Sequence, residues 1–403
     1  MMHFSRRVSL SEPNAITLAA GKRRAQGQKL ENISDSNPTR HGLGNTERPY
    51  QADPRGSGAA RRALADFLSQ RDQRKVDPDN LYLLSSTSQG YSWLMKLLCD
   101  PGEAVLAPTP GYPLIEALAN LENVQVASYS FAWLGRKWEL DPLSLPAAGV
   151  SPRPRALVVI NPGNPTGAYL DRGERKLLLD YCGDNNLPLI ADEVFYDFPL
   201  SAAPESRARL AGCPEILTFA LDGLSKNLCA PGVKIAWLEV SGPEELVKAA
   251  KARLDIIADA FLPFSDILAA QLPDFLEEIP SQSARTRERC AANLDTLQSL
   301  VGEDPVSPVT VMSPQGGWNG LLRFPSHIDE DELVEDLLKD YGIYCQPGYF
   351  FDLPFSGTIS LSLLLQPDSF RKNAAKVLRT VTALSYGDSR VSSSSRRLGE
   401  CLD

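Results

Sequence analysis

Short apolar runs alternate with amphipathic segments over the first two thirds of the chain. Seven of these runs predict strands, at residues 81–84, 104–107, 124–128, 156–160, 188–191, 216–220 and 233–240. Segments with helical spacing of apolar residues lie between several of them, at 90–98, 114–121 and 172–182. Strands that are apolar throughout, rather than alternating, are typical of a parallel sheet buried on both faces. The pattern therefore predicts an α/β fold with a mostly parallel seven-stranded sheet.

The pattern changes after residue 244. Long helical stretches at 244–278, interrupted by Pro263, and at 281–301 precede a mixed segment. That segment reads as strand 320–324, helix 332–340, strands 343–346 and 359–363, and helix 370–384. It predicts a smaller α+β domain, completed by an N-terminal helix at 12–29. We expect an N-terminal helix and loop at 1–45, a large domain at 46–275, a small domain at 276–385 and a disordered Ser-rich tail at 386–403.

The amino-acid composition excludes several kinds of site and partner from the expected function. Three histidines are scattered over 403 residues, which argues against a multi-histidine metal site, so we expect no metal. The net charge of −9 disfavours nucleic-acid and anionic membrane partners. Seven cysteines without a C-x-x-C motif indicate reduced thiols rather than a disulfide framework. No apolar run is long enough to span a membrane and no secretory signal is evident, so we expect a cytoplasmic protein.

Four segments at predicted strand ends carry polar residues suited to chemistry. They are Ser85–Tyr91 at a strand-to-helix junction, Asn161–Gly167, Ala191–Phe195, and Leu221–Lys226. Hydroxyls and free N–H groups at a helix N-terminus suit a phosphate. Taken singly, each segment also fits an ordinary loop or turn. Their order along one α/β frame is what distinguishes them.

With these motifs the chain, from about residue 12 to 385, resembles the pyridoxal-phosphate-dependent aminotransferases of the aspartate aminotransferase fold (fold type I, class I/II). The sequence N-P-G-N-P-T-G is followed by Asp192, 28 residues after Asn164, and by Lys226, 34 residues after Asp192. The resemblance implies a large domain with a mostly parallel sheet, a small α+β domain, and pyridoxal 5'-phosphate as cofactor.

The resemblance also implies a role for individual residues. Lys226 would form the Schiff base and shuttle the proton, and Asp192 would pair with the pyridinium nitrogen. Asn164 would bond the ring 3-oxygen and Tyr112 would stack on the ring, although Tyr112 also fits a turn aromatic of the core. The expected phosphate contacts are Ser86, Thr87, Ser88, Lys234 and, reaching across a homodimer interface, Tyr50.

Four positions depart from the family pattern. Phe195 replaces a tyrosine that donates to the 3-oxygen, Gly223 replaces a hydroxyl residue, and Lys234 replaces an arginine on the phosphate. The largest departure is Ser360, which stands where the family carries the arginine for the substrate α-carboxylate. Either Arg40, in the loop that begins at Asn37, replaces that arginine, or the substrate lacks an α-carboxylate. The alternative for Arg40 is a role in a salt bridge at the solvent-exposed surface or between domains. Two interpretations are open for Trp318, a wall of the substrate pocket or a residue of the core.

The sequence therefore predicts an aminotransferase that moves an amino group between an amine or amino-acid donor and a keto acceptor, in a homodimer with shared sites. A lyase, racemase or cyclase of the same fold would use the same residues, so these remain alternatives. A non-catalytic, cofactor-binding regulatory protein is a more distant one.

Overall fold

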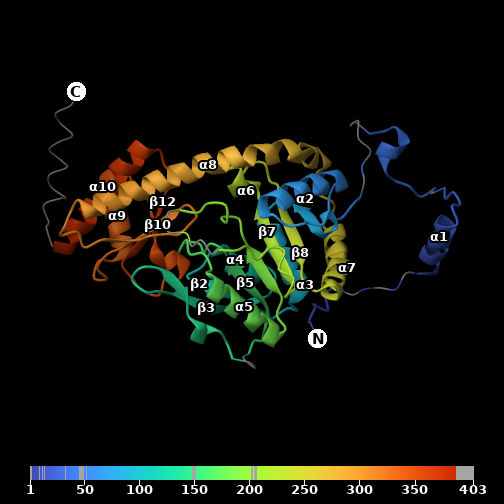
Figure 1. Cartoon of the computed structure of the whole chain (residues 1–403), viewed down its shortest axis with the longest axis horizontal. Helices are drawn as coiled ribbons and strands as arrows, with labels where there is room; N and C mark the ends of the chain where they lie inside the picture. The colour runs from blue at the N-terminus through green and yellow to red at the C-terminus, as the bar shows by residue number, and fades with distance from the viewer. Residues whose placement is uncertain are drawn as a thin grey trace.

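The computed structural model describes residues 2–8, 10, 12, 14–31, 33–44, 50, 52–147, 151–200, 203 and 207–386. The tail predicted at 386–403 lies outside the described residues apart from Tyr386. Two sheets lie side by side and α8 (Asp266–Gly302) runs across both (Figure 1). None of the described helices is long and apolar enough to cross a membrane.

The larger sheet has eight strands in the order β1-β8-β7-β6-β5-β2-β3-β4. The strands are β1 (Leu81–Leu84), β2 (Ala104–Thr109), β3 (Gln125–Trp133), β4 (Trp138–Leu140), β5 (Pro154–Ile160), β6 (Leu189–Asp192), β7 (Thr218–Gly223) and β8 (Ala236–Ser241). The run from β3 to β7 is parallel, whereas β8 is antiparallel to both of its neighbours. The sheet has one strand more than predicted, because the three-residue β4 pairs with the end of β3.

Helices cover both faces of this sheet, as its apolar strands predict. They are α2 (Gly58–Asp72), α3 (Thr87–Leu98), α4 (Leu114–Leu121), α5 (Arg172–Asn185), α6 (Leu224–Asn227) and α7 (Glu244–Ala260). One core joins Trp93 and Leu94 of α3 to Phe219 of β7, and another joins Leu178 of α5 to Leu189 of β6. Single turns of 3-10 helix occur at η1 (Pro38–His41), η2 (Pro78–Asn80), η3 (Pro142–Ser144) and η4 (Gly348–Phe351).

The smaller sheet is antiparallel, in the order β11-β12-β10-β9. Its strands are β9 (Thr310–Met312), β10 (Asn319–Arg323), β11 (Gln346–Pro347) and β12 (Thr358–Ser362), and it is flanked by α9 (Glu330–Tyr341) and α10 (Pro367–Tyr386). A core built around Leu322, Ile359 and Phe370 holds this part together. Of the strand predicted at 343–346, only Gln346 lies in a strand, the two-residue β11.

The predicted helix break between residues 278 and 281 is wrong. Helix α8 continues through Pro273 and Pro280, each of which removes one backbone donor. Buried side chains on one face of the helix, such as Leu272, Leu276 and Ile279, pack against α2 and hold the helix in place. The domain boundary expected at 275–276 falls inside α8, which contacts α2 near its start and α10 near its end. The boundary therefore remains a prediction.

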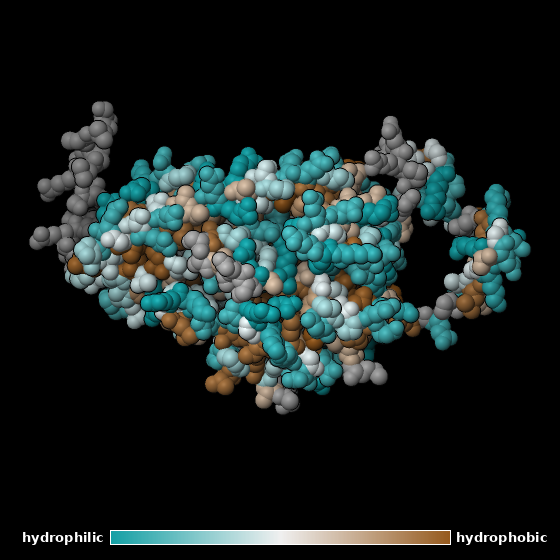
Figure 2. Space-filling view, viewed as in Figure 1, coloured by the Kyte–Doolittle hydropathy of each residue, from teal (hydrophilic) through white to brown (hydrophobic). Residues whose placement is uncertain are grey.

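The N-terminal helix does not lie against the smaller sheet in the single chain. Residues 14–31 and 33–44, which we call the arm, carry α1 (Ala15–Ala25), shorter than the helix predicted at 12–29. Helix α1 lies at the opposite end of the molecule from α9 and α10 and has no buried residue (Figure 1). Figure 2 shows the arm standing apart from the body with hydrophobic residues on its surface. Ile16 and Ile33 of the arm are 81% and 98% exposed.

Candidate active site

Lys226 lies in the single turn of α6, directly after β7. Its Nζ is 5.1 Å from the ring centroids of both Phe195 and Trp318, which meet edge to face. Burial lowers the pKa of the Lys226 amine, and the charge of Asp192 opposes this shift. A partly desolvated lysine has a larger unprotonated fraction near neutral pH, which is the form that attacks a carbonyl.

Asp192 ends β6, the strand next to β7, and is buried. Tyr91 Oη donates to its Oδ2 at 2.9 Å, and the backbone N–H of Val194 donates to its Oδ1 at 3.2 Å. Burial raises the pKa of Asp192 to about 6, although these two hydrogen bonds and Lys226 oppose the shift. A buried carboxylate with few donors is suited to hold a cationic ring N–H.

The next predicted site residues are those at the start of α3, a helix that contacts Asp192 through Tyr91, and Tyr112. Ser86 caps α3 by accepting from the backbone N–H of Gln89, and the first turn, with Thr87 and Ser88, holds no acidic residue. Tyr91, one turn further on, provides the hydrogen bond to Asp192. Burial and, after it, the charge of Asp192 both raise the pKa of the Tyr112 phenol. The uncapped N–H groups and hydroxyls at the start of α3 are suited to an anion, and Tyr91 of the same helix connects this end to the acidic Asp192.

Asn164 is held by a residue that sequence reasoning did not single out. Asn319, the first residue of β10, donates from Nδ2 to Asn164 Oδ1 at 2.9 Å. The signal was its place beside Trp318 in Gly316–Gly320, where only Trp318 was considered, as a pocket wall or as a core residue. The smaller sheet thus contributes Trp318 and Asn319 to the surroundings of Lys226 and Asn164.

The other predicted site residues make no hydrogen bond or ion pair with Lys226, Asp192 or Asn164 in the described part of the chain. Lys234 is exposed with a positive φ of 59°, and Ser360 is buried on β12 opposite Leu321. In the arm, Arg40 pairs with Asp35 at 3.2 Å. The remaining two, Asn37 and Tyr50, bond to each other and to Thr39: Asn37 Nδ2 donates to the Tyr50 carbonyl, and the Tyr50 N–H donates to Thr39 Oγ1.

Two of the departures from the family pattern have a packing reason. Phe195 packs against Trp318 and Phe198, so an apolar wall stands where a hydroxyl donor would be. At Gly223 a Cβ would lie 2.9 Å from the Ala236 Cβ of the neighbouring strand β8, which leaves no room for a serine side chain without displacement.

A buried ion cluster lies behind α6 and the end of β6. It comprises Arg71, Asp72, Glu193, Asp197, Arg209 and Asp222. Arg71 Nη1 lies 2.9 Å from Asp222 Oδ2, and Asp222 Oδ1 in turn accepts from the Gly223 N–H and from Asn227 Nδ2. Gly223 precedes the turn that carries Lys226 and Asn227 ends it, so the hydrogen bonds of Asp222 connect the ion cluster to that turn and hold it in place.

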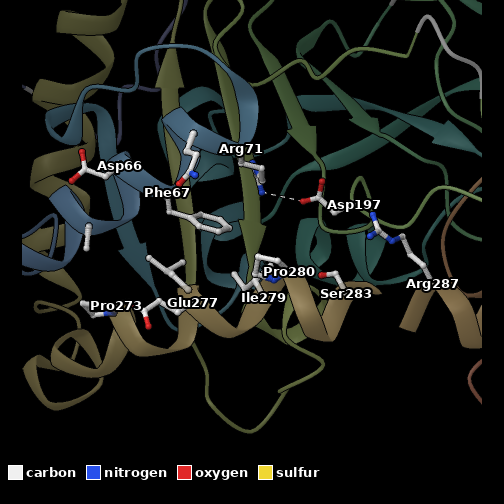
Figure 3. Close-up of a pocket in the computed structure, with 13 residues that line it drawn as sticks. Asp66, Phe67, Arg71, Asp197, Pro273, Glu277, Ile279, Pro280, Ser283 and Arg287 are labelled. Atoms are coloured by element: carbon white, nitrogen blue, oxygen red, sulfur yellow. Dashed lines mark hydrogen bonds and ion pairs between the residues drawn. The ribbon is translucent and has the colours of Figure 1, made fainter. Parts of the chain in front are cut away.

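The Arg71–Asp197 pair also lines a surface groove of about 590 Å³ between α2 and α8 (Figure 3). Phe67, Leu276 and Ile279 give the groove an apolar floor, and none of the predicted site residues lines it. The groove is therefore distinct from the group around Lys226, although it shares the ion cluster with it.

Comparison with known proteins agrees with this arrangement. Residues 13–376 match the model of the aminotransferase class I and II family, so the chain belongs to that family. Its members depend on pyridoxal phosphate, and this chain is a pyridoxal-phosphate-dependent aminotransferase of the aspartate aminotransferase fold.

Individual relatives are distant in sequence. The chain is 26% identical over 339 residues to glutamate-pyruvate aminotransferase AlaA of Escherichia coli, covering 81% of each chain. It is 24% identical over 303 residues to tyrosine aminotransferase of Caenorhabditis elegans, covering 74% of this chain and 64% of that one. The structure of alanine aminotransferase from Pyrococcus furiosus superposes with a TM-score of 0.73 at 19% identity, covering 91% and 95% of the two chains, which shows the shared fold.

The donor set of the site fits pyridoxal phosphate. The α3 N-terminus with its hydroxyls suits the phosphate, and Asp192 suits the ring nitrogen. Asn164 offers an amide for the ring oxygen, and the half-buried amine of Lys226 suits the aldehyde. The buried Nε1 of Trp318 has no hydrogen-bond partner among the described residues, which is consistent with a site that holds a polar group.

The raised pKa of Asp192 makes a prediction for the stability of the cofactor-free protein. A carboxyl whose pKa is about 6 when folded and ordinary when unfolded retains its proton longer in the folded state, so its contribution to stability falls as pH rises through 6. Between about pH 5 and pH 8, wild type should lose about 1.5 kcal/mol relative to Asp192→Asn, measured by urea unfolding at each pH. A constant difference between the two proteins across this range would contradict the assignment.

Proposed function

We propose that the group around Lys226 is the aminotransferase site and that its residues act as follows. Lys226 would attach the cofactor, and its amine, once released, would take the proton from the donor carbon and deliver it to the bound cofactor within the same half-reaction; the second half-reaction would run this transfer in reverse. Asp192 keeps the ring nitrogen protonated, and the α3 N-terminus with Ser86, Thr87 and Ser88 holds the phosphate. When bound, pyridoxal phosphate withdraws electrons from the carbon that loses the proton. The observation that carries this proposal is the half-buried Lys226 amine beside the buried Asp192 carboxylate.

We also propose that the enzyme discriminates weakly between an amino acid and the corresponding amine without a carboxylate. Ser360 offers no charge at the position where the family has an arginine, and Arg40 is already paired with Asp35 in the single chain. Phe195, Phe198 and Trp318 form an apolar wall beside Lys226, which favours an aromatic or apolar donor.

The test uses a matched pair of donors, phenylalanine and 2-phenylethylamine, in the first half-reaction. We expect their rate constants at low donor concentration to differ by less than about tenfold in wild type, because no arginine at position 360 favours the carboxylate. Ser360→Arg should then favour phenylalanine by a further factor of at least about 10, the effect of one bidentate arginine–carboxylate pair. If wild type prefers phenylalanine by much more than this, the carboxylate is bound elsewhere; Arg40→Ala then tests Arg40.

We further propose a cytoplasmic homodimer in which the arm reaches the partner's site. The exposed apolar residues of the arm support this, since Ile16, Ile33 and Leu43 have no cover in the single chain. Such an arrangement would also bring Tyr50, Asn37 and Arg40, which lie apart from Lys226 in one chain, to a second copy.

Shared sites make a specific prediction for mixed dimers. Lys226→Ala and Tyr50→Ala dimers should each be impaired, but a mixed dimer of the two variants contains one site with both residues intact. Mixing and refolding the two variants should therefore restore activity above that of either parent. If the mixture is no more active than the average of its parents, the sites are not shared through Tyr50.

A further inference from the structure

Asn319 is the one side chain of the smaller sheet for which the structure records a hydrogen bond to Asn164. It stands at the first position of β10, and its Nδ2 donates to Asn164 Oδ1 at 2.9 Å. Asn164 belongs to the loop that follows β5 in the larger sheet, 155 residues earlier in the chain. With Oδ1 engaged, the Nδ2 of Asn164 is the polar group left to face the site, and no described residue accepts a hydrogen bond from it.

We propose that Asn319 is a positioning residue that turns the Asn164 Nδ2 donor toward the 3-oxygen of pyridoxal phosphate. This inference rests on the proposed function, which places Asn164 beside that oxygen. An amide that is free to rotate presents either its oxygen or its nitrogen, and only the nitrogen can donate. A donor fixed in advance loses less conformational freedom when the ligand binds.

The apolar side chains of Phe195 and Trp318 make the Asn164 Nδ2 donor more important. Phe195 has no hydroxyl, and its ring packs against Trp318, the residue next to Asn319. Since Phe195 supplies no hydrogen bond to the 3-oxygen, the orientation of one amide has a larger share in binding this part of the ligand. The smaller sheet therefore takes part in cofactor binding through Asn319 as well as forming a wall through Trp318.

The opposite orientation of the two amides has a different consequence. If Asn164 donated to Asn319, the Asn164 oxygen would face the 3-oxygen of the ligand, and two acceptors would meet. Replacing Asn319 by aspartate separates the two cases, because a carboxylate accepts but cannot donate. The proposed orientation predicts that Asn319→Asp disrupts the contact, whereas the opposite orientation predicts that it preserves the contact.

The experiment measures binding of pyridoxal phosphate and of its 3-deoxy analogue to the cofactor-free full-length chain by equilibrium dialysis. Asn319→Ala should weaken pyridoxal phosphate binding by about 5-fold, the effect of one hydrogen bond, and Asn319→Asp by at least as much. Binding of the 3-deoxy analogue should be unchanged in both variants, since it has no oxygen at that position. In an Asn164→Ala background, Asn319→Ala should add no further loss.

Asn373→Asp, at a half-buried position of α10, is the matched control for placing a charge in the same part of the chain. The inference is overturned if Asn319→Asp binds pyridoxal phosphate as wild type does, or if both ligands are weakened equally. Failure of the proposed function is a separate result: wild type would then show no attachment of pyridoxal phosphate to Lys226, whatever residue stands at position 319.

Discussion

Replacing Lys226 by alanine should lower the transamination rate by about 10⁴-fold, because the variant loses both the attachment point and the proton-transferring amine. The measurement is single-turnover conversion of a donor by protein loaded with excess pyridoxal phosphate. The thermal unfolding midpoint of the cofactor-free variant should stay close to that of wild type, since burial already disfavours the charged amine. Lys176→Ala, at an exposed pair on α5, is the control and should retain full activity.

A variant that kept more than a small fraction of the wild-type rate would show that another lysine is the reacting group. A variant that unfolded with a markedly lower midpoint would instead mean that Lys226 has a structural role, and activity would then have to be compared at a temperature where both proteins are folded.

Replacing Arg71 by methionine should lower the free energy of unfolding by about 3–5 kcal/mol, because it leaves the buried Asp222 without an ion-pair partner and removes one of the cations that face Asp72 and Asp197. Arg71 contacts Asp222 at 2.9 Å and Asp197 at 3.2 Å, and its own side chain is 15% exposed. Burial alone would lower the pKa of the Arg71 guanidinium, but the surrounding carboxylates, Asp222 foremost, hold that pKa above its ordinary value. Urea unfolding of the cofactor-free protein gives the comparison.

Two further variants make the Arg71 prediction specific. Arg55→Met removes a comparable bidentate arginine from Asp255, but at a more exposed pair outside the buried ion cluster, and should be less destabilising. The double variant Arg71→Met/Asp222→Asn should recover at least about 1 kcal/mol relative to Arg71→Met, because it removes one of the stranded charges. An equal decrease in the free energy of unfolding in Arg71→Met and Arg55→Met would contradict the prediction that the buried ion cluster contributes more to stability than the Arg55–Asp255 pair.

The elements that sequence reasoning predicted well are those whose own residues decide the structure. The strand at 81–84 and the helix at 114–121 were predicted with the bounds that the structure shows, since uninterrupted apolar residues or helical spacing define them. Strand β4 was not predicted, because three residues form a strand only through pairing with β3. Helix α8 was divided at Pro280 in the prediction because the sequence does not reveal the packing partner that holds the helix together.

The candidate site divides in the same way. Lys226, Asp192 and Asn164 stand in contiguous motifs at strand ends, so their order along the chain was enough to single them out. The buried ion cluster draws on positions 71, 72, 193, 197, 209 and 222, and no spacing rule connects α2 to the ends of β6 and β7. Asn319 was missed for a similar reason: its importance depends on a contact between the two sheets that neither segment reveals alone.

The rival reactions share this site. A lyase, racemase or cyclase of the same fold would need the same lysine and the same buried aspartate, and differs in what happens to the donor after the proton is removed. The half-reaction with phenylalanine and 2-phenylethylamine therefore also addresses this question: an aminotransferase leaves the cofactor in its amine form and releases a carbonyl product, whereas the rivals return it unchanged.

The central claim is that Lys226 is the lysine that holds pyridoxal phosphate. The most direct measurement is to load the full-length protein with pyridoxal phosphate, reduce it with borohydride, digest it and locate the modified lysine by mass spectrometry. The account predicts stoichiometric modification of the peptide that contains Lys226 and none at Lys234. Modification of another lysine at the same stoichiometry, with Lys226 unmodified, would contradict it.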